Sequence, residues 1–92
     1  MSYVKTIYTK EDLSMARIID GTEKNLIGDN LKKLRTERKM SQQTLSGKLE
    51  LLGVYVCRGS VSRIEDKSRT VTDIELYSIA NVLGVDIKDL FE

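Results

Sequence analysis

The stretch that decides the fold covers residues 41–65 and reads SQQTLSGKLELLGVYVCRGSVSRIE. Serine is a favoured N-cap residue, so Ser41 predicts the start of a helix. Leu45 and Leu49 then lie one helical turn apart and give this helix an apolar face. Gly53 can end the helix, and the sequence GVYV that it opens is predicted to be a turn.

The second half of this stretch predicts another short helix, over residues 58–66. Val61 and Ile64 are three positions apart and share one face, which can pack against a core. The positions with no core to enter are Arg58, Gly59, Ser60, Ser62 and Arg63. Small and donor-rich side chains on a short helix suit the DNA major groove, and an arginine pairs bidentately with guanine. The alternative for the two arginines is ordinary solvated surface charge.

Charge is unevenly distributed along the chain, although the formal net charge is only +1. Residues 1–25 carry four basic and four acidic residues, residues 26–70 ten basic and five acidic, and residues 71–92 one basic and five acidic. The excess of basic residues lies where the two-helix stretch lies, which favours a polyanionic partner. The alternative is a solvated helical surface. About half of a set of four basic residues is predicted to neutralise phosphates, while the rest would serve only solubility. The set is Lys32, Lys33, Lys67 and Arg69.

Composition limits the class of protein. A chain of 92 residues, 40% of them hydrophobic, can bury one small core, and the absence of proline favours helices. One cysteine cannot form an internal disulfide, and no apolar run of about 18 residues could span a membrane. The N-terminus lacks the apolar region of a secretory signal, so a cytoplasmic location is expected. Without histidine, a metal-ligand cluster or a glycine-rich phosphate loop, neither enzymatic activity nor a cofactor is expected.

Three further helices are predicted around this stretch. Ile27, Leu31 and Leu34 recur at i, i+4 and i+7 and predict a helix over residues 26–38. A capping box of Thr and Glu predicts a helix over residues 72–83, and an aspartate predicts a last short helix from residue 86. The residues expected to be buried there are Ile74, Leu76 or Tyr77, Ile79, Ala80, Leu83, Ile87, Leu90 and Phe91. The last two can alternatively face a second copy of the chain.

Residues 1–25 are interpreted as an N-terminal extension of a domain over residues 26–92. Residues 1–8 are β-branched and aromatic and predict a short strand or an ordered arm, and residues 10–20 predict a possible helix. Residues 21–25, GTEKN, have the composition of a linker. The extension can be a DNA arm, a dimerisation element or a segment that binds a protein partner. Its net charge of zero makes the DNA arm the weakest of these.

The motifs LKKLRTERKMSQQTL, VSRIED and TDIELYSIANVLGVDIKDLF, in this order, resemble the helix-turn-helix domain of phage Cro and cI-type repressors and their bacterial, XRE-like relatives. The resemblance covers about residues 26–92 and implies a five-helix, lambda-repressor-like all-α fold. It also implies a transcriptional regulator, expected to be a repressor and a homodimer. Each protomer would lay helix 58–66 into a major groove of an inverted-repeat operator in double-stranded DNA.

The resemblance also implies roles for individual residues. The residues that would contact DNA are Gln42, Gln43, Arg58, Gly59, Ser60, Ser62 and Arg63. Gln42 would bond a phosphate and approach a base edge, while Ser60 would reach a phosphate or a base. Arg35 and Glu65 occupy positions that in some members form a partly buried ion pair. Glu65 would then be structural, and removing one partner would cost about 3–5 kcal/mol.

The chain departs from the family pattern in one place, because the two-helix unit within residues 41–65 is longer than usual. We interpret the extra residues as one more turn of the first helix and a longer loop. Leu45, Leu49 and Leu52 are then expected to stay near one face. The longer loop can also present Tyr55 to the DNA backbone, where its hydroxyl can donate.

Two alternatives remain open. The longer loop and residues 1–25 also fit a protein–protein interaction module of the same fold, such as an antitoxin or an anti-repressor, because a fold alone does not determine function. Cys57 is predicted to be a small residue that precedes the second helix. A cysteine at a helix N-terminus can instead have a low pKa and act as a redox sensor.

Overall fold

The computed structural model of the 92-residue chain describes residues 22–92. In this part, the elements are α2 (Gly28–Glu37), α3 (Gln42–Leu51), α4 (Arg58–Glu65), α5 (Asp73–Leu83) and the 3-10 helix η2 (Ile87–Leu90). The all-α fold class is therefore confirmed for the described residues. The strand or arm predicted over residues 1–8 and the helix predicted over residues 10–20 lie outside them and stay predictions.

The helix ends are set by the capping residues that the sequence predicts. The Ser41 hydroxyl accepts a backbone N–H of the first turn of α3, and Gly53 follows this helix with a left-handed φ of 82°. Thr72 and Glu75 make both bonds of the capping box at the start of α5. Gly84 ends α5 with a φ of 71°, a conformation that glycine adopts without steric cost.

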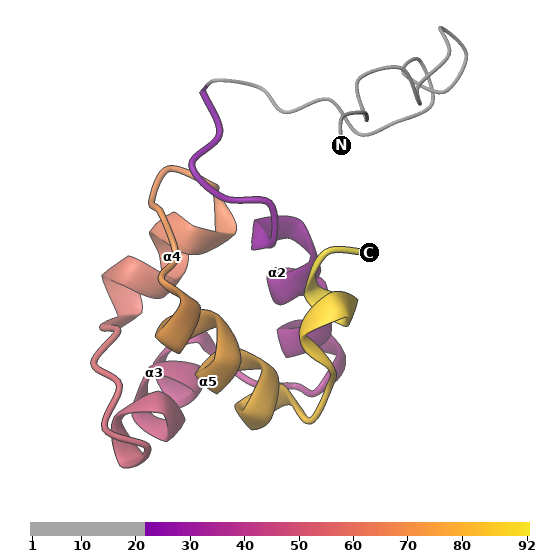
Figure 1. Cartoon of the computed structure of the whole chain (residues 1–92). Coiled ribbons are helices and arrows are strands. Elements are labelled where there is room, and N and C mark those ends of the chain that lie inside the picture. Colours follow the sequence, from indigo (N-terminus) through magenta and orange to yellow (C-terminus); the bar gives the residue numbers. More distant parts are fainter. Residues whose placement is uncertain (1–21) are drawn as a thin grey trace, which may run out of the picture.

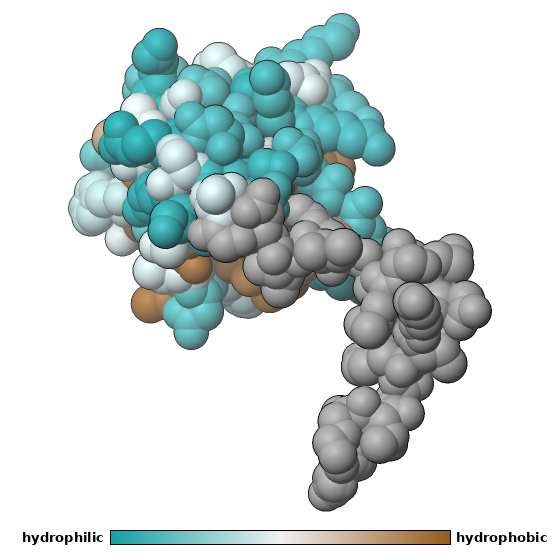
Figure 2. All heavy atoms as spheres, turned by 90° about the horizontal axis from the view of Figure 1, so that it is seen from above, coloured by the Kyte–Doolittle hydropathy of each residue, from teal (hydrophilic) through white to brown (hydrophobic). Residues whose placement is uncertain are grey.

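The helices pack around one core. In the described part of the chain, α4 contacts α2 and α3, α5 contacts α3 and η2, and η2 returns to α2 (Figure 1). The side chains with no exposed surface are Leu31, Leu45, Leu49, Val61, Ile64, Ile79 and Leu90. The apolar faces predicted for the two helices of residues 41–65 are therefore confirmed. The face seen in Figure 2 is largely hydrophilic, with hydrophobic residues showing mainly along its lower part.

Some apolar residues that were predicted to be buried are exposed, and so is Leu52, which was expected to stay near the face of Leu45 and Leu49. Leu52 is 53% exposed, because it follows the last residue of α3 and leads into the turn. Ile74 and Tyr77 are 66% and 61% exposed. The buried face of α5 is formed instead by Ser78, Ile79, Ala80 and Leu83. Ile74 and Tyr77 project from the opposite side of the helix, and Leu76 is the half-buried member of the predicted pair.

The last predicted helix is shorter than expected, so the five-helix prediction needs correction. Within residues 22–92 there are four α-helices and the four-residue 3-10 helix η2. Reciprocal bonds between Asp86 and Asp89 close this single turn. One turn can direct only one side inward, so Leu90 is buried while Ile87 and Phe91 are 39% and 42% exposed.

Residues 23–25, whose composition predicts part of a linker, are bonded to the end of α4. The backbone N–H of Lys24 donates to the carbonyl oxygen of Lys67 at 2.9 Å, and the Asn25 side-chain amide donates to that of Ile64 at 3.0 Å. The linker prediction is therefore wrong for these residues. The partners of Asn25 lie about forty residues further along the chain, where no local pattern can reveal them.

A buried ion pair joins α2 to α4. Arg35 Nε lies 2.6 Å from Glu65 Oε2, and Arg35 Nη2 donates to Glu65 Oε1 at 3.0 Å. Arg35 Nη1 also donates to the carbonyl oxygen of Met40 at 2.6 Å, and Gln42 Nε2 donates to Glu65 Oε1 at 3.0 Å. The two side chains are only 9% and 4% exposed. Arg35 and Glu65 are the two residues for which the family resemblance implies a structural ion pair.

We expect Glu65→Gln to lower the free energy of unfolding by about 3–5 kcal/mol, because it leaves the buried Arg35 guanidinium without its counter-charge. Denaturation in urea measures this difference. Glu50→Gln removes the same charge from an exposed position on α3 and is the matched control. Equal stability of the two variants would contradict the structural role of the pair.

Candidate nucleic-acid interface

Helix α4 has a buried side and an exposed side. Its buried side is formed by Val61, Ile64 and Glu65. Its exposed side, here called the α4 face, is formed by Arg58, Gly59, Ser62 and Arg63. At about 100° of rotation per residue, these four positions fall within an arc of roughly 140°. The structure therefore brings four predicted site residues onto one outward surface, with the half-buried Ser60 at its edge.

An open hollow lies beside the α4 face, between α3 and the loop that precedes α4. Its volume is about 700 Å³. The predicted site residues that line it are Gln43, Tyr55, Arg58, Gly59 and Ser60. Glu50 lines it as well and was missed, although its spacing of seven from Gln43 places both on one face of α3. The hollow thus gathers donors from two helices and one negative charge.

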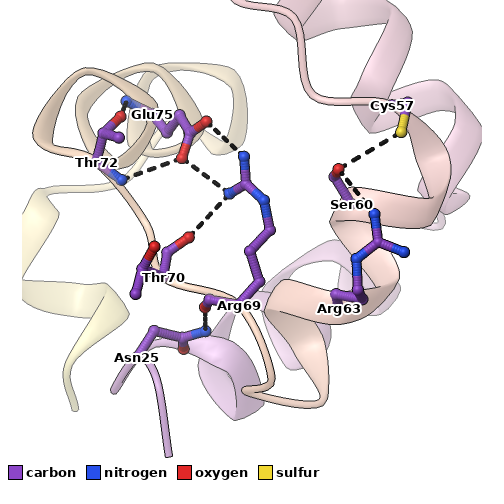
Figure 3. A network of polar contacts seen from close by, with 8 residues as sticks. All are labelled: Asn25, Cys57, Ser60, Arg63, Arg69, Thr70, Thr72 and Glu75. Atoms are coloured by element: carbon purple, nitrogen blue, oxygen red, sulfur yellow. Dashed lines mark hydrogen bonds and ion pairs between the residues drawn. The ribbon is translucent and has the colours of Figure 1, made fainter.

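Three side chains form a chain of polar contacts along α4 (Figure 3). The Cys57 thiol donates to Ser60 Oγ at 3.5 Å, and Arg63 Nη2 donates to the same oxygen at 3.4 Å. In the ionised form the Ser60 hydroxyl and backbone N–H donate to the thiolate instead, and these hydrogen bonds lower the pKa of Cys57 below its ordinary value of 9.0. Ser60 therefore holds the Arg63 guanidinium along the helix and favours the thiolate of the exposed Cys57. The redox alternative for Cys57 stays a prediction.

The four basic site residues differ in their partners. Lys67 Nζ lies 2.8 Å from Asp29 Oδ2 and 3.3 Å from Glu23 Oε2, and hydrogen bonds to these carboxylates raise the pKa of Lys67. Both terminal nitrogen atoms of the Arg69 guanidinium donate to the carboxylate of Glu75 on α5 (Figure 3). Within residues 22–92, neither Arg58 nor Arg63 pairs with a carboxylate.

Arg69 and Glu75 form the second strong pair of the domain. Arg69 Nη1 and Nη2 donate to Glu75 Oε1 and Oε2 at 2.9 and 2.8 Å. Arg69 Nη1 also donates to the carbonyl oxygen of Thr70, and the Thr72 N–H donates to Glu75 Oε1. The hydrogen bonds from Arg69 lower the pKa of Glu75 and raise that of Arg69. The pair therefore fastens the loop after α4 to the start of α5.

Gln42 occupies the first position of α3, and its side chain is engaged within the protein. Its Nε2 donates to Glu65 Oε1, which joins α3 to the ion pair beneath the α4 face. The N-terminal end of a helix also directs unpaired backbone N–H groups outward, where they can receive a phosphate. The contact of Gln42 with DNA, like those of the other predicted site residues, stays a prediction.

The described part of the chain shows no feature of a metal site or of a membrane span. Among residues 22–92, no three His, Cys, Asp or Glu side chains are grouped so that they could hold a metal ion. No helix in this range combines the length and the apolar character needed to cross a bilayer. The features that remain are hydrogen-bond donors and unpaired guanidinium groups, which suit an anionic partner.

Comparisons with known proteins add to this picture. The family model described as helix-turn-helix matches residues 31–90. The restriction-modification controller protein C.AhdI from Aeromonas hydrophila has a similar structure, with a TM-score of 0.62 and 29% identity over 71% of this chain and 91% of that chain. A search of curated proteins found no match.

Two other solved structures are similar. The hydroxypropylphosphonic acid epoxidase from S. wedmorenis has a TM-score of 0.62 and 28% identity over 77% of this chain, but over only 35% of its own. The DNA-binding domain of BldD has a TM-score of 0.63 and 22% identity, over 80% of this chain and 100% of that domain. At 22% identity, the likeness to BldD concerns the fold alone. The likeness to the epoxidase concerns only about a third of that enzyme.

The Arg69–Glu75 pair predicts a contribution to acid stability. The lowered pKa of Glu75 means that its contribution is present at neutral pH, begins to be lost as the pH falls below its ordinary pKa of 4.5, and disappears below the lowered pKa. We expect Glu75→Gln to flatten the decline in unfolding free energy between neutral pH and pH of about 3. Glu37→Gln, at an exposed position of α2, controls for net charge. Parallel curves for wild type and Glu75→Gln would contradict this.

Proposed function

This chain belongs to the Cro/cI-type, XRE-like helix-turn-helix family of DNA-binding transcriptional regulators, and from this premise we propose that it is a sequence-specific repressor that inserts α4 into the major groove. The observation that supports the proposal best is the α4 face, because its two arginines have no carboxylate partner within residues 22–92 and share one arc with two small residues. We assign DNA binding to residues 26–92 and treat residues 1–25 as an extension. Catalysis is not part of the proposal.

Base recognition is assigned to the α4 face. Arg58 and Arg63 can each donate two hydrogen bonds to guanine, while Ser62 can donate or accept at a base edge. Gly59 leaves room for the helix backbone to approach the groove closely. Ser60 is assigned to hold Arg63 and to meet a phosphate or a base.

Phosphate contacts are assigned to the residues around the hollow. The N-terminal end of α3, with Gln42 and Gln43, can receive one phosphate, and the exposed Tyr55 hydroxyl can donate to another. We expect Lys67 and Arg69 to contribute less to phosphate binding than these residues, because a phosphate would have to displace a carboxylate from each of them. Such contacts determine the position of the protein on the duplex and the dependence of affinity on salt.

The protein is proposed to act as a homodimer on an inverted repeat, with half-sites about one helical turn apart. The exposed Ile74 and Tyr77 of α5 and the partly exposed Phe91 supply apolar surface that a second copy can cover. Leu90 is unavailable for this contact, because it is fully buried within one chain. Analytical ultracentrifugation of the full chain, with and without DNA, tests the state of assembly.

A second candidate function rests on a separate observation. Leu51, Leu52 and Tyr55 are 86%, 53% and 79% exposed and lie close together in the chain at the end of α3. Exposed apolar side chains of this size are typical of protein-binding surfaces. A protein–protein module, such as an antitoxin or an anti-repressor, would use this surface without DNA. Pull-down from a nuclease-treated extract separates this candidate from the first.

DNA binding is tested by selecting the preferred sequence from a random duplex library. Titration of that duplex at several salt concentrations then measures the affinity. We expect Arg58→Ala and Arg63→Ala each to weaken binding to the selected sequence roughly 5- to 150-fold, because one bidentate base contact is lost. Lys88→Ala, at an exposed position of η2, is the control for charge. A flat plot of log affinity against log salt would contradict DNA binding, since phosphate contacts must release counterions.

Gly59 gives a prediction that separates stability from recognition. A Cβ atom at this position would meet only Arg63 Nη1, at 3.8 Å, so nothing in the free protein requires glycine there. We expect Gly59→Ala to raise the unfolding free energy by up to about 1 kcal/mol while weakening operator binding, because the added methyl group separates α4 from the groove.

Gly47→Ala on α3 is the matched control, because a Cβ there meets nothing within 4 Å. It is expected to give a similar gain in stability with unchanged operator affinity. If both variants bind the operator as well as the wild type, α4 does not approach the duplex closely at Gly59.

A further inference from the structure

A single asparagine side chain joins the segment before α2 to the region at the end of α4. Asn25 Nδ2 donates to the carbonyl oxygens of Ile64 at 3.0 Å and Arg69 at 2.8 Å, and Figure 3 shows the second of these bonds. Asn25 Oδ1 accepts the backbone N–H groups of Ile27 at 3.0 Å and Gly28 at 2.9 Å. The amide therefore bonds α2 at its start and α4 at its end simultaneously.

Further bonds connect the same two segments. The Lys24 N–H donates to the carbonyl oxygen of Lys67, and the Lys67 ammonium is held by Asp29 and Glu23. Lys67 has a left-handed φ of 65°, which is uncommon for a residue with a Cβ atom. The surrounding bonds hold this residue in the conformation that ends α4 and turns the chain towards α5.

The two segments also approach closely through their backbones. A Cβ atom on Gly28 would lie 2.5 Å from the carbonyl oxygen of Ile64 and 2.8 Å from that of Glu65. Any larger residue at Gly28 would push α2 and the end of α4 apart. The start of α2 and the last turn of α4 are therefore in direct backbone contact.

We infer that Glu23, Asn25 and Asp29, here called the clamp, position the last turn of α4 for DNA recognition, with Asn25 as the principal positioning residue. The inference rests on the proposed function. All three residues precede residue 31, where the family match begins, so the clamp lies outside the matched region.

The physical reason lies in the length of α4. This helix has eight residues, and Ser62 and Arg63 lie within one turn of Ile64, whose carbonyl oxygen Asn25 holds. Bidentate contacts with bases need well-placed side chains, whereas attraction to phosphates depends mainly on charge. Loosening the last turn therefore reduces specific binding more than non-specific binding.

Two variants of Asn25 separate its two roles. Asn25→Ala removes both the acceptor for the start of α2 and the donors for the end of α4. Asn25→Ser keeps a hydroxyl that can accept the N–H groups of α2, since serine is also a favoured N-cap residue. A serine hydroxyl cannot donate to two carbonyl groups at once, and neither variant changes the charge of the protein.

The experiment uses the full chain and measures three quantities for each variant. Thermal unfolding reports overall stability, and hydrogen exchange reports opening at the backbone amides of residues 66–68, which bond to the last turn of α4. Titrations at fixed salt compare affinity for the selected operator with affinity for a scrambled duplex. Asn25→Asp is omitted because its added charge would alter DNA binding on its own.

For Asn25→Ser we expect a smaller loss of thermal stability than for Asn25→Ala, together with faster exchange at residues 66–68. Operator affinity is expected to fall about tenfold, which corresponds to one or two lost hydrogen bonds. Affinity for the scrambled duplex and the dependence on salt are expected to stay unchanged. Asn25→Ala is expected to lose stability as well as operator affinity.

Two results would overturn the inference. One is native operator affinity in Asn25→Ser, which would leave Asn25 with only a capping role. The other is an equal loss of affinity for both duplexes, which would indicate general destabilisation. If wild type selects no DNA sequence, the proposed function fails, and native exchange at residues 66–68 in Asn25→Ser would then overturn the clamp independently.

Discussion

The arrangement of the domain depends on the buried pair of Arg35 and Glu65. The guanidinium binds the carboxylate through two nitrogen atoms and also reaches the carbonyl oxygen of Met40, while Gln42 donates to the same carboxylate. One polar network thus joins α2, the loop after it, the start of α3 and the end of α4. Because a buried charge without a partner is costly, the network favours the relative arrangement of these elements in which its groups meet.

That arrangement explains why α4 can expose arginines without losing stability. Val61 and Ile64 pack into the core on one side of α4, and Arg35 neutralises Glu65 on the same side. The residues of the α4 face are therefore not needed for packing of the core. The other cations near this helix are treated differently, since Lys67 and Arg69 are bound to carboxylates that fasten loops. The protein thereby separates cations that hold the fold from cations that remain available to a ligand.

Both strong attachments of α4 lie at its C-terminal end, where Glu65 meets Arg35 and the Ile64 carbonyl meets Asn25. Its N-terminal end is bounded by the exposed Cys57 and Tyr55, beside the hollow that α3 helps to form. The exposed apolar residues on α5 and after α3 remain for contacts with further molecules.

The sequence alone determined the all-α class, the helices near 28–37, 42–51, 58–65 and 73–83, and the outward set on α4, because caps and apolar spacing act over only a few residues. Only the tertiary structure decided that Ile74 and Tyr77 face outward, that Lys67 and Arg69 are paired, and that Asn25 reaches Ile64. The Lys67–Asp29 and Asn25–Ile64 contacts join residues 38 and 39 positions apart, which no local pattern can reveal. The orientation of α5 and the pairing of Arg69 with Glu75 depend on how α5 packs against the rest of the fold.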